Sequence, residues 1–353
     1  MIIVLGLLAS GAFAMVAPTE AEGAGEIRIT DTLNREIILS GPVDHIVTMG
    51  VGFTTTVIDL GCKDKIVGVD PYSTEDYTGD SNFSGLESLG SIYSASAGQI
   101  MYTTLLQLRD QGKFTENDVI VVPSTYSGII DSSVGLLAIL DKIGSAKINV
   151  LALAAETYEG VIEAVEAVAK ALGKESDSMV TDMRDLKTYV EDKVESENLV
   201  GGAGIHISSA GKVYNRSILV SFIDIAGGVN AGSNGSNDLS YATDKAALLQ
   251  MSQVNQNTTI FLDSGHSLTA SEFKNENNLT CNVVKVNAKW NNVSPSVTDG
   301  LWFVAMCMYP EAFEGDMPDF GEETPDNTLL YIGAGAIVAV LICVIAVVYL
   351  RKS

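Results

Sequence analysis

The chain has 353 residues and a formal net charge of −23, because 44 Asp and Glu residues outnumber 21 Lys and Arg residues. Nucleic-acid binding requires a basic surface. A chain this acidic is therefore not expected to have a nucleic-acid partner. Between two apolar ends lie about 300 residues, enough for two lobes that each have a core.

The N-terminal run 1–8 (MIIVLGLL) is followed by small residues and by the triplet Ala12-Phe13-Ala14. This order is typical of a signal peptide with a small-residue cleavage site, although no Lys or Arg precedes Arg28. We therefore expect residues 1–24 to be a signal peptide and leader.

A small hairpin is predicted in Ile27–Leu39, with two strands around Leu33-Asn34. Short β-rich runs then alternate with helix-length segments, which favours a parallel sheet covered on both faces. The runs are Asp44–Gly50, Lys65–Asp70, Asp118–Pro123 and Ile148–Leu153. Residues 25–172 are therefore predicted to form an N-terminal α/β lobe.

Two helices follow this lobe. Thr157–Gly173 has apolar residues at helical spacing and a glycine suited to the C-terminal cap. Glu175–Ser196 is longer, and its apolar stripe runs from Met179 to Val194 with charges between. We expect residues 173–197 to form a helix that joins two lobes.

The strand pattern then restarts in Gly204–Ser208, Thr258–Asp263 and Cys281–Val286, with helical stretches between and after. Residues 198–314 are therefore predicted to form a C-terminal α/β lobe. The expected fold class is α/β, with two lobes joined by one long helix and followed by a transmembrane helix.

That transmembrane helix is predicted at 328–350, where the chain has no charge. A helix of this length spans roughly 35 Å and crosses a bilayer core of about 30 Å. Residues 315–327 are acidic and rich in Pro and Gly, which is typical of a solvated tether. Arg351 and Lys352 place the tail 351–353 in the cytoplasm, so we expect a single-pass protein of the cell membrane whose globular part is extracellular.

Four Cys occur without C-x-x-C spacing, so neither a zinc site nor a disulfide framework is indicated. Buried free Cys is the favoured interpretation, and a Cys281–Cys307 bridge remains an alternative. Six Asn-x-Ser/Thr sequons predict glycosylation of an extracellular glycoprotein. They begin at Asn82, Asn215, Asn234, Asn257, Asn278 and Asn292.

The common enzyme motifs are absent: there is no G-x-S-x-G, H-E-x-x-H or Walker A sequence, so we expect no enzyme and no resident cofactor or metal. Gly50-Val51-Gly52 follows a predicted strand and favours a tight turn over a dinucleotide site. His45 and His206 lie inside predicted strands, where a core role is the more common one, whereas His266 lies in a loop.

Five segments, in order, resemble the substrate-binding proteins of ABC importers for ferric siderophores, haem and vitamin B12. They are 29–50 (ITDTLNREIILSGPVDHIVTMG), 57–70 (VIDLGCKDKIVGVD), 136–175 (LLAILDKIGSAKINVLALAAETYEGVIEAVEAVAKALGKE), 223–233 (IDIAGGVNAGS) and 289–313 (KWNNVSPSVTDGLWFVAMCMYPEAF). The resemblance implies the class III periplasmic-binding-protein fold: two Rossmann-like lobes joined by one long rigid helix, with a ligand between the lobes. The C-terminal anchor indicates a membrane-anchored, archaeal-type member.

The resemblance implies an ABC importer permease as partner and a small metal chelate or corrinoid as ligand. Many family members dock through one Glu on each lobe. Here 102–106 reads YTTLL and 242–249 reads ATDKAALL, so neither segment has that Glu. The alternative is therefore a surface receptor or adhesion protein that kept the fold without permease docking.

Loops after parallel strands line the ligand crevice in α/β lobes, and this rule selects the candidate site. Tyr and Trp offer flat apolar area, His a hydrogen-bond donor or metal ligand, and Arg a charge partner for carboxylates or phenolates. Trp290 and Arg216 are the expected anchors. The full candidate set is Tyr72, Tyr126, Tyr214, Arg216, His266 and Trp290.

Overall fold

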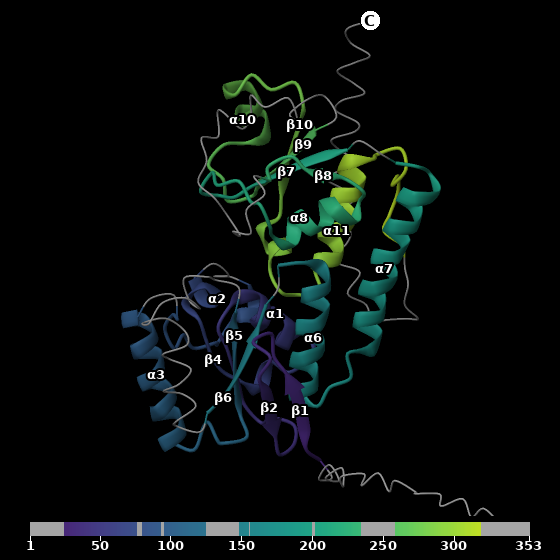
Figure 1. Cartoon of the computed structure of the whole chain (residues 1–353). Coiled ribbons are helices and arrows are strands. Elements are labelled where there is room, and N and C mark those ends of the chain that lie inside the picture. Colours follow the sequence, from purple (N-terminus) through teal and green to yellow (C-terminus); the bar gives the residue numbers. More distant parts are fainter. Residues whose placement is uncertain are drawn as a thin grey trace, which may run out of the picture.

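The computed structural model in Figure 1 describes residues 25–75, 80–92, 95–124, 148–154, 156–199, 202–233 and 258–318. The predicted leader 1–24 and transmembrane helix 328–350 lie outside these ranges, as do the tail, most of the tether, Tyr126, Asn234 and Asn257. Within the ranges, no helix combines the length and hydropathy that a bilayer span requires.

The N-terminal lobe contains a four-stranded parallel sheet in the order β4-β3-β5-β6. Its strands are β3 (Ile46–Thr48), β4 (Ile66–Val69), β5 (Val119–Pro123) and β6 (Asn149–Leu153). Its described helices are α1 (Val51–Asp59), α2 (Pro71–Glu75) and α3 (Ala95–Asp110), with short 3-10 turns η1 (Lys63–Lys65) and η2 (Ser81–Phe83). All five residues of β5 are buried, as expected of a strand covered on both faces.

The predicted hairpin is present as β1 (Ile27–Thr30) and β2 (Glu36–Leu39), which pair antiparallel. Asp31, only 4% exposed, holds its turn. The Asp31 carboxylate accepts hydrogen bonds from the backbone N–H groups of Leu33 and Arg35, both at 3.0 Å, and from the backbone N–H of Ala152 in β6 at 3.3 Å. One buried carboxylate thus fastens the hairpin to the sheet.

The C-terminal lobe repeats the design with a second parallel sheet in the order β10-β9-β7-β8. Its strands are β7 (Ala203–Ile207), β8 (Val229–Asn230), β9 (Thr258–Asp263) and β10 (Asn282–Val286). Among the residues that the structure describes in this lobe, the helices are α8 (Ile218–Ile225), α10 (Ala270–Glu276) and α11 (Val297–Met308), with the 3-10 turn η3 (Ala288–Asn291). The expectation of an α/β fold with parallel sheets is confirmed.

Two antiparallel helices, α6 (Tyr158–Leu172) and α7 (Asp177–Ser196), lie along one side of the molecule in Figure 1 and extend from one lobe to the other. Gly173 ends α6 in the left-handed conformation at φ 65°, as its sequence position predicts. The first half of α6 packs in one buried cluster with α7, α8 and α11, whereas its second half packs on the N-terminal lobe. The lobes therefore share a helical pair, and α6 contributes to the junction alongside the predicted helix.

Each sheet has a topological switch point, where the connections from two neighbouring strands run to opposite sides. It lies between β3 and β5 in the first sheet and between β7 and β9 in the second. Ligands of open α/β sheets bind beyond the carboxyl ends of the strands near such points. In this chain those ends are turned toward the other lobe, because α1, which follows β3, contacts the loop that follows β10. The fold thus places the two sets of strand-end loops opposite each other.

Candidate functional site

The lobes meet through specific polar contacts. The Thr56 hydroxyl in α1 donates to the carbonyl oxygen of Val293 at 2.8 Å. The backbone N–H of Tyr158, at the start of α6, donates to the Ser221 hydroxyl of α8 at 2.9 Å. Arg216 of the C-terminal lobe forms an ion pair with Glu156 of the N-terminal lobe. These contacts are short-range, so they fix the relative position of the strand-end loops.

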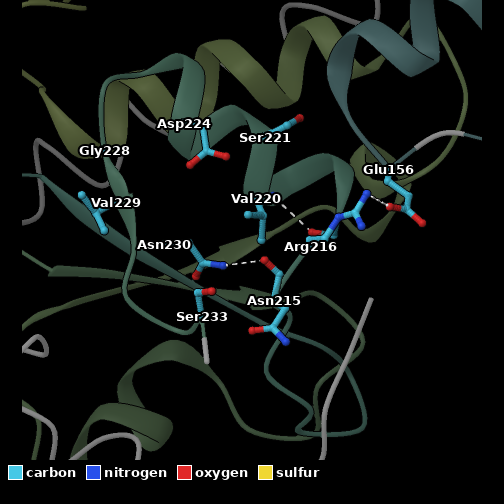
Figure 2. A pocket seen from close by; sticks show the side chains of 11 residues that line it. Glu156, Asn215, Arg216, Val220, Ser221, Asp224, Gly228, Val229, Asn230 and Ser233 are labelled. Carbon is cyan, nitrogen blue, oxygen red and sulfur yellow. Dashed lines mark hydrogen bonds and ion pairs between the residues drawn. The ribbon is translucent and has the colours of Figure 1, made fainter. Parts of the chain in front are cut away.

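A pocket of about 430 Å³ opens beside the Arg216–Glu156 ion pair. Figure 2 shows that its wall is formed by the loop after β7, by α8 and by the turn into β8, with Glu156 reaching in from the other lobe. Its lining is mostly polar and small. The lining residues are Glu156, Asn215, Arg216, Ser217, Val220, Ser221, Asp224, Gly228, Val229, Asn230 and Ser233.

The backbone that carries Arg216 is fixed by Asn230 of β8. The side-chain amide nitrogen of Asn230 donates to the carbonyl oxygens of Tyr214 at 3.2 Å and Asn215 at 2.9 Å. Its amide oxygen accepts a hydrogen bond from the backbone N–H of Gly232 at 3.0 Å. A single side chain therefore ties the Arg216 loop to the edge strand, which preorganises the pocket before a ligand arrives.

A buried chain of hydrogen bonds supports the loop that carries Arg216 on its inner side. His206, in β7 and fully buried, contacts the Ser217 hydroxyl through Nδ1 at 3.0 Å and an Asp263 carboxylate oxygen through Nε2 at 3.2 Å. The Ser217 hydroxyl also accepts the backbone N–H of Val220 at 3.1 Å and so caps α8. Ser217 is only 5% exposed and is committed as a cap, so this chain of hydrogen bonds positions the loop rather than presenting a nucleophile.

The charges in the pocket are unequal. Its lining has one cation, Arg216, and two carboxylates, Glu156 and Asp224. Burial raises the pKa of the Asp224 carboxyl above its ordinary value of 3.8. The Glu156 side chain is 20% exposed and the Arg216 side chain 46%, so the ion pair lies at the rim, where water still reaches the guanidinium. Such a site suits an anionic group at the rim and hydrogen-bonding groups further in.

No group of three or more metal-ligating side chains comes together among the described residues. The part of the chain that the structure describes therefore provides hydrogen-bond donors, acceptors and one guanidinium for a ligand, and it shows no built metal centre.

Of the predicted site residues within the described ranges, the structure brings only Arg216 to this pocket. Tyr214 instead stacks on His206, with ring centroids 4.6 Å apart. Trp290 packs against Phe303 at 5.2 Å and belongs to the fringe of the shared apolar cluster. An indole that can bury its area on neighbouring helices gains more there than in a half-open loop, which explains the difference.

The remaining predicted residues lie elsewhere. Tyr72 is 44% exposed on the short helix α2 and does not line the pocket. His266 contacts the Phe273 ring edge-on at 5.5 Å, and its Nδ1 accepts the backbone N–H of Leu268 at 3.2 Å. Sequence reasoning missed Glu156, Asn215 and Asn230 as pocket residues. Only Asn230 had a sequence signal, the Gly-Gly-x-Asn turn in 227–230.

The two strand histidines differ from each other. His206 is a bonded core residue, as its place in a predicted strand indicates. His45 lies one residue before β3 with its side chain 33% exposed, so its predicted place inside a strand is wrong. β3 begins after His45 because the Asp118 carboxylate accepts a hydrogen bond from the His45 backbone N–H at 2.8 Å. The same carboxylate contacts the His45 ring Nδ1 at 3.1 Å.

Cysteine and sequon positions also differ in their surroundings. Cys62 and Cys281 are buried and free, and Cys307 is half-buried and free, so no Cys281–Cys307 bridge forms. Asn215 is only 4% exposed and lines the pocket, a setting that disfavours a glycan there, and its glycosylation stays a prediction. Asn82 and Asn278 are exposed and Asn292 is half-buried; glycosylation at these three sites stays a prediction.

No family model matches the sequence, and no curated protein matches it. Solved structures do. CeuE of Helicobacter pylori, crystallised as a nickel–histidine complex, is 17% identical with a TM-score of 0.64, covering 82% of this chain and 90% of CeuE. The periplasmic vitamin B12 binding protein BtuF of Vibrio cholerae is 15% identical with a TM-score of 0.53, covering 78% of this chain and 99% of BtuF.

A periplasmic haem-binding protein from Pseudomonas aeruginosa is 17% identical with a TM-score of 0.55, covering 80% of this chain and 99% of that protein. These TM-scores establish a shared fold, whereas identities this low leave the ligand open. The shared fold includes both parallel sheets, because four-fifths or so of this chain is matched in each case. The chain therefore has the class III periplasmic-binding-protein fold, the fold of periplasmic solute-binding proteins.

Proposed function

We propose that this protein captures a small chelate between its two lobes on the outer side of the cell membrane and delivers it to an ABC importer. The observation that carries the proposal is the polar pocket at the lobe junction, where Arg216 and Glu156 of opposite lobes meet. A binding role is also supported by the proteins that share this fold, whose names state nickel–histidine, vitamin B12 and haem as ligands. The mechanism is capture and release, without bond chemistry.

Between an iron chelate and a corrinoid, the pocket favours an anionic iron chelate. Its one cation, Arg216, can pair with a carboxylate or phenolate oxygen through two parallel N–H groups. The described lining has no aromatic ring, whereas a flat macrocycle such as haem or a corrin would gain most from one. A siderophore-like chelate that carries negative charge matches this chemistry best.

Membrane attachment is part of the proposal. The apolar run 328–350 would anchor the protein, and the acidic segment 315–327 would hold the two lobes above the bilayer. This arrangement would keep the lobes near an importer in the same membrane.

A permease partner follows from the role that the fold has in other proteins, yet the docking surface differs here. Position 103, on α3, has Thr, and it is exposed, so no Glu extends from this part of the first lobe. A surface receptor that kept the fold without an importer is the second candidate, and the missing carboxylate favours it. Importer permease and ATPase genes beside this gene would support the first candidate over the second.

A binding panel tests the function directly. The purified full chain in detergent would be titrated calorimetrically with ferric citrate, a ferric tris-catecholate, a neutral ferric trihydroxamate, haemin and cyanocobalamin. We expect the anionic ferric chelates to bind and Arg216→Ala to weaken them by about tenfold or more. Preferential binding of haemin or cyanocobalamin, unaffected by Arg216→Ala, would refute the anionic-chelate assignment.

A further inference from the structure

The guanidinium best placed to receive an anionic ligand already has a carboxylate partner. Glu156 precedes α6 in the N-terminal lobe, yet its side chain crosses the junction to Arg216 in the C-terminal lobe (Figure 2). Both residues line the pocket. The ion pair therefore occupies the position where an oxyanion of a ligand would bind.

We infer that Glu156 is an internal competitor for the Arg216 site: it neutralises the guanidinium until a ligand oxyanion displaces it. This inference rests on the proposed function and adds the regulation of the same site. The ligand group is a carboxylate, phosphate or phenolate oxygen, because such oxyanions can pair with the Arg216 guanidinium that the Glu156 carboxylate contacts.

The charges of the pocket explain what the competition achieves. With Glu156 in place the Arg216 charge is cancelled, and Asp224 adds further negative potential, so weakly held anions are excluded. A multidentate chelate can replace Glu156 because it also bonds to the small polar side chains deeper in the pocket. A single small anion has no such compensation. Glu156 would thus select for ligands that carry an oxyanion and additional hydrogen-bonding groups.

The surrounding contacts indicate that Glu156 can leave while the lobes stay together. Tyr158, two residues later, is held by its backbone N–H to the Ser221 hydroxyl at 2.9 Å, and its own hydroxyl donates to the Met183 carbonyl oxygen at 2.8 Å. Tyr158 is 1% exposed, so the start of α6 is firmly packed. Displacement of Glu156 therefore requires a side-chain rotation at the rim, with little movement of α6.

The test uses Glu156→Gln, which keeps the shape of the side chain and removes its charge. Glu166→Gln, on α6, is the matched control, because it also removes one carboxylate charge. The ion pair that it breaks, with Arg184 at 2.9 Å, lies outside the pocket. Inorganic phosphate serves as the probe, added to the full chain in detergent. Binding is followed in every variant by isothermal titration calorimetry. In the variants that keep Arg216, its Nε–H signal in nitrogen-15 NMR, assigned from the spectrum of Arg216→Lys, reports contact of phosphate with the guanidinium.

We expect Glu156→Gln to bind phosphate about fivefold more tightly than the unmodified chain, and Glu166→Gln to leave the affinity unchanged. Combining Glu156→Gln with Arg216→Lys should abolish most of the gain, because the planar N–H fork is lost. The inference is overturned if Glu156→Gln gives no gain or no detectable binding, if the gain survives loss of Arg216, or if Glu166→Gln gives the same gain.

The chelate panel separates this result from the proposed function. If the unmodified chain binds a ferric chelate and Glu156→Gln leaves phosphate affinity unchanged, the function stands and the competition fails. If Glu156→Gln gains phosphate affinity while no chelate binds the unmodified chain, the competition stands and the function fails.

Discussion

At the scale of single residues, Asn230 shows how one side chain fixes the site. Its amide nitrogen donates to the Tyr214 and Asn215 carbonyl oxygens, and its amide oxygen accepts from Gly232. The donors and the acceptor have different partners, so a replacement that keeps only the oxygen separates their contributions.

Asn230→Asp should therefore lower the free energy of unfolding by about 1–3 kcal/mol, because two carbonyl oxygens lose their donor. It should also weaken chelate binding through the loop that carries Arg216. Asn287→Asp is the matched control, since Asn287 uses only its side-chain oxygen, which accepts the Lys289 backbone N–H at 3.0 Å. Urea unfolding of both variants checks this, and equal effects would contradict the role of the Asn230 donor.

Asp299, in the first turn of α11, gives a prediction about pH. Burial raises the pKa of its carboxyl from 3.8 to about 6, so the folded protein holds this proton more tightly than the unfolded chain. Its contribution to stability is therefore present below pH 3.8 and is lost as the pH rises through about 6.

Asp299→Asn, which cannot ionise, should raise the free energy of unfolding by about 1–2 kcal/mol at neutral pH and change little in acid. Asp177→Asn, on the exposed first turn of α7, is the matched control and should give no such gain. Denaturation curves across a pH series measure both. A loss of stability at neutral pH in Asp299→Asn would contradict the assigned burial effect.

Residue roles were only partly predictable from the sequence. The rule that loops after strands line a crevice found Arg216, because its position in the chain decides its exposure. The same rule also selected Trp290 and Tyr214, which do not line this pocket, because it ignores what large rings gain by packing on Phe303 and His206. Glu156 could not be found at all, since its partner lies in the other lobe.

At the scale of elements, the contact between α1 and the loop after β10 sets the distance between the lobes. Gly52 in α1 lies so close to that loop that an added Cβ would be 2.4 Å from the Val293 backbone nitrogen and 2.9 Å from its carbonyl oxygen. Both atoms are backbone, so the loop itself would have to move. The Thr56–Val293 hydrogen bond at 2.8 Å belongs to the same contact.

Gly52→Ala should therefore destabilise the protein by about 1–3 kcal/mol, although alanine is the better helix former. Gly41→Ala is the matched control: an added Cβ there meets nothing closer than the Gly25 carbonyl oxygen at 3.8 Å. It should change stability by no more than about 0.5 kcal/mol. Thermal unfolding measures both, and a gain in stability for Gly52→Ala would show that the α1 contact is loose.

Most elements were predictable because local chemistry agrees with the fold. The buried β-rich runs form the strands β5, β6 and β9. Gly173 ends α6, as expected of the residue that most readily adopts the left-handed conformation. The sharing of α6 between the lobes was not predicted. An apolar stripe shows that a helix is buried, whereas the identity of its neighbours depends on contacts between distant segments.

At the scale of the whole molecule, the lobes are joined by a packed helical pair. The cluster of α6, α7, α8 and α11 is continuous and includes Tyr158, Met183, Leu186 and Val190, each 1% exposed or less. A packed core of this kind resists hinge motion, because opening it would expose apolar area to water.

We therefore expect ligand to close the lobes only slightly. Small-angle X-ray scattering of the full chain in detergent-matched buffer, with and without a bound ferric chelate, should give nearly the same radius of gyration. A large decrease on binding would mean that the α6–α7 pair bends, which its packing does not predict.

The most direct test of the account is a crystal structure of the protein with a captured anionic ferric chelate. We predict chelate density at the lobe junction, with an oxygen of the ligand in hydrogen-bond contact with the Arg216 guanidinium and the Glu156 side chain turned away from it. Density for the chelate at any other position, with the Arg216–Glu156 ion pair intact, would contradict the account.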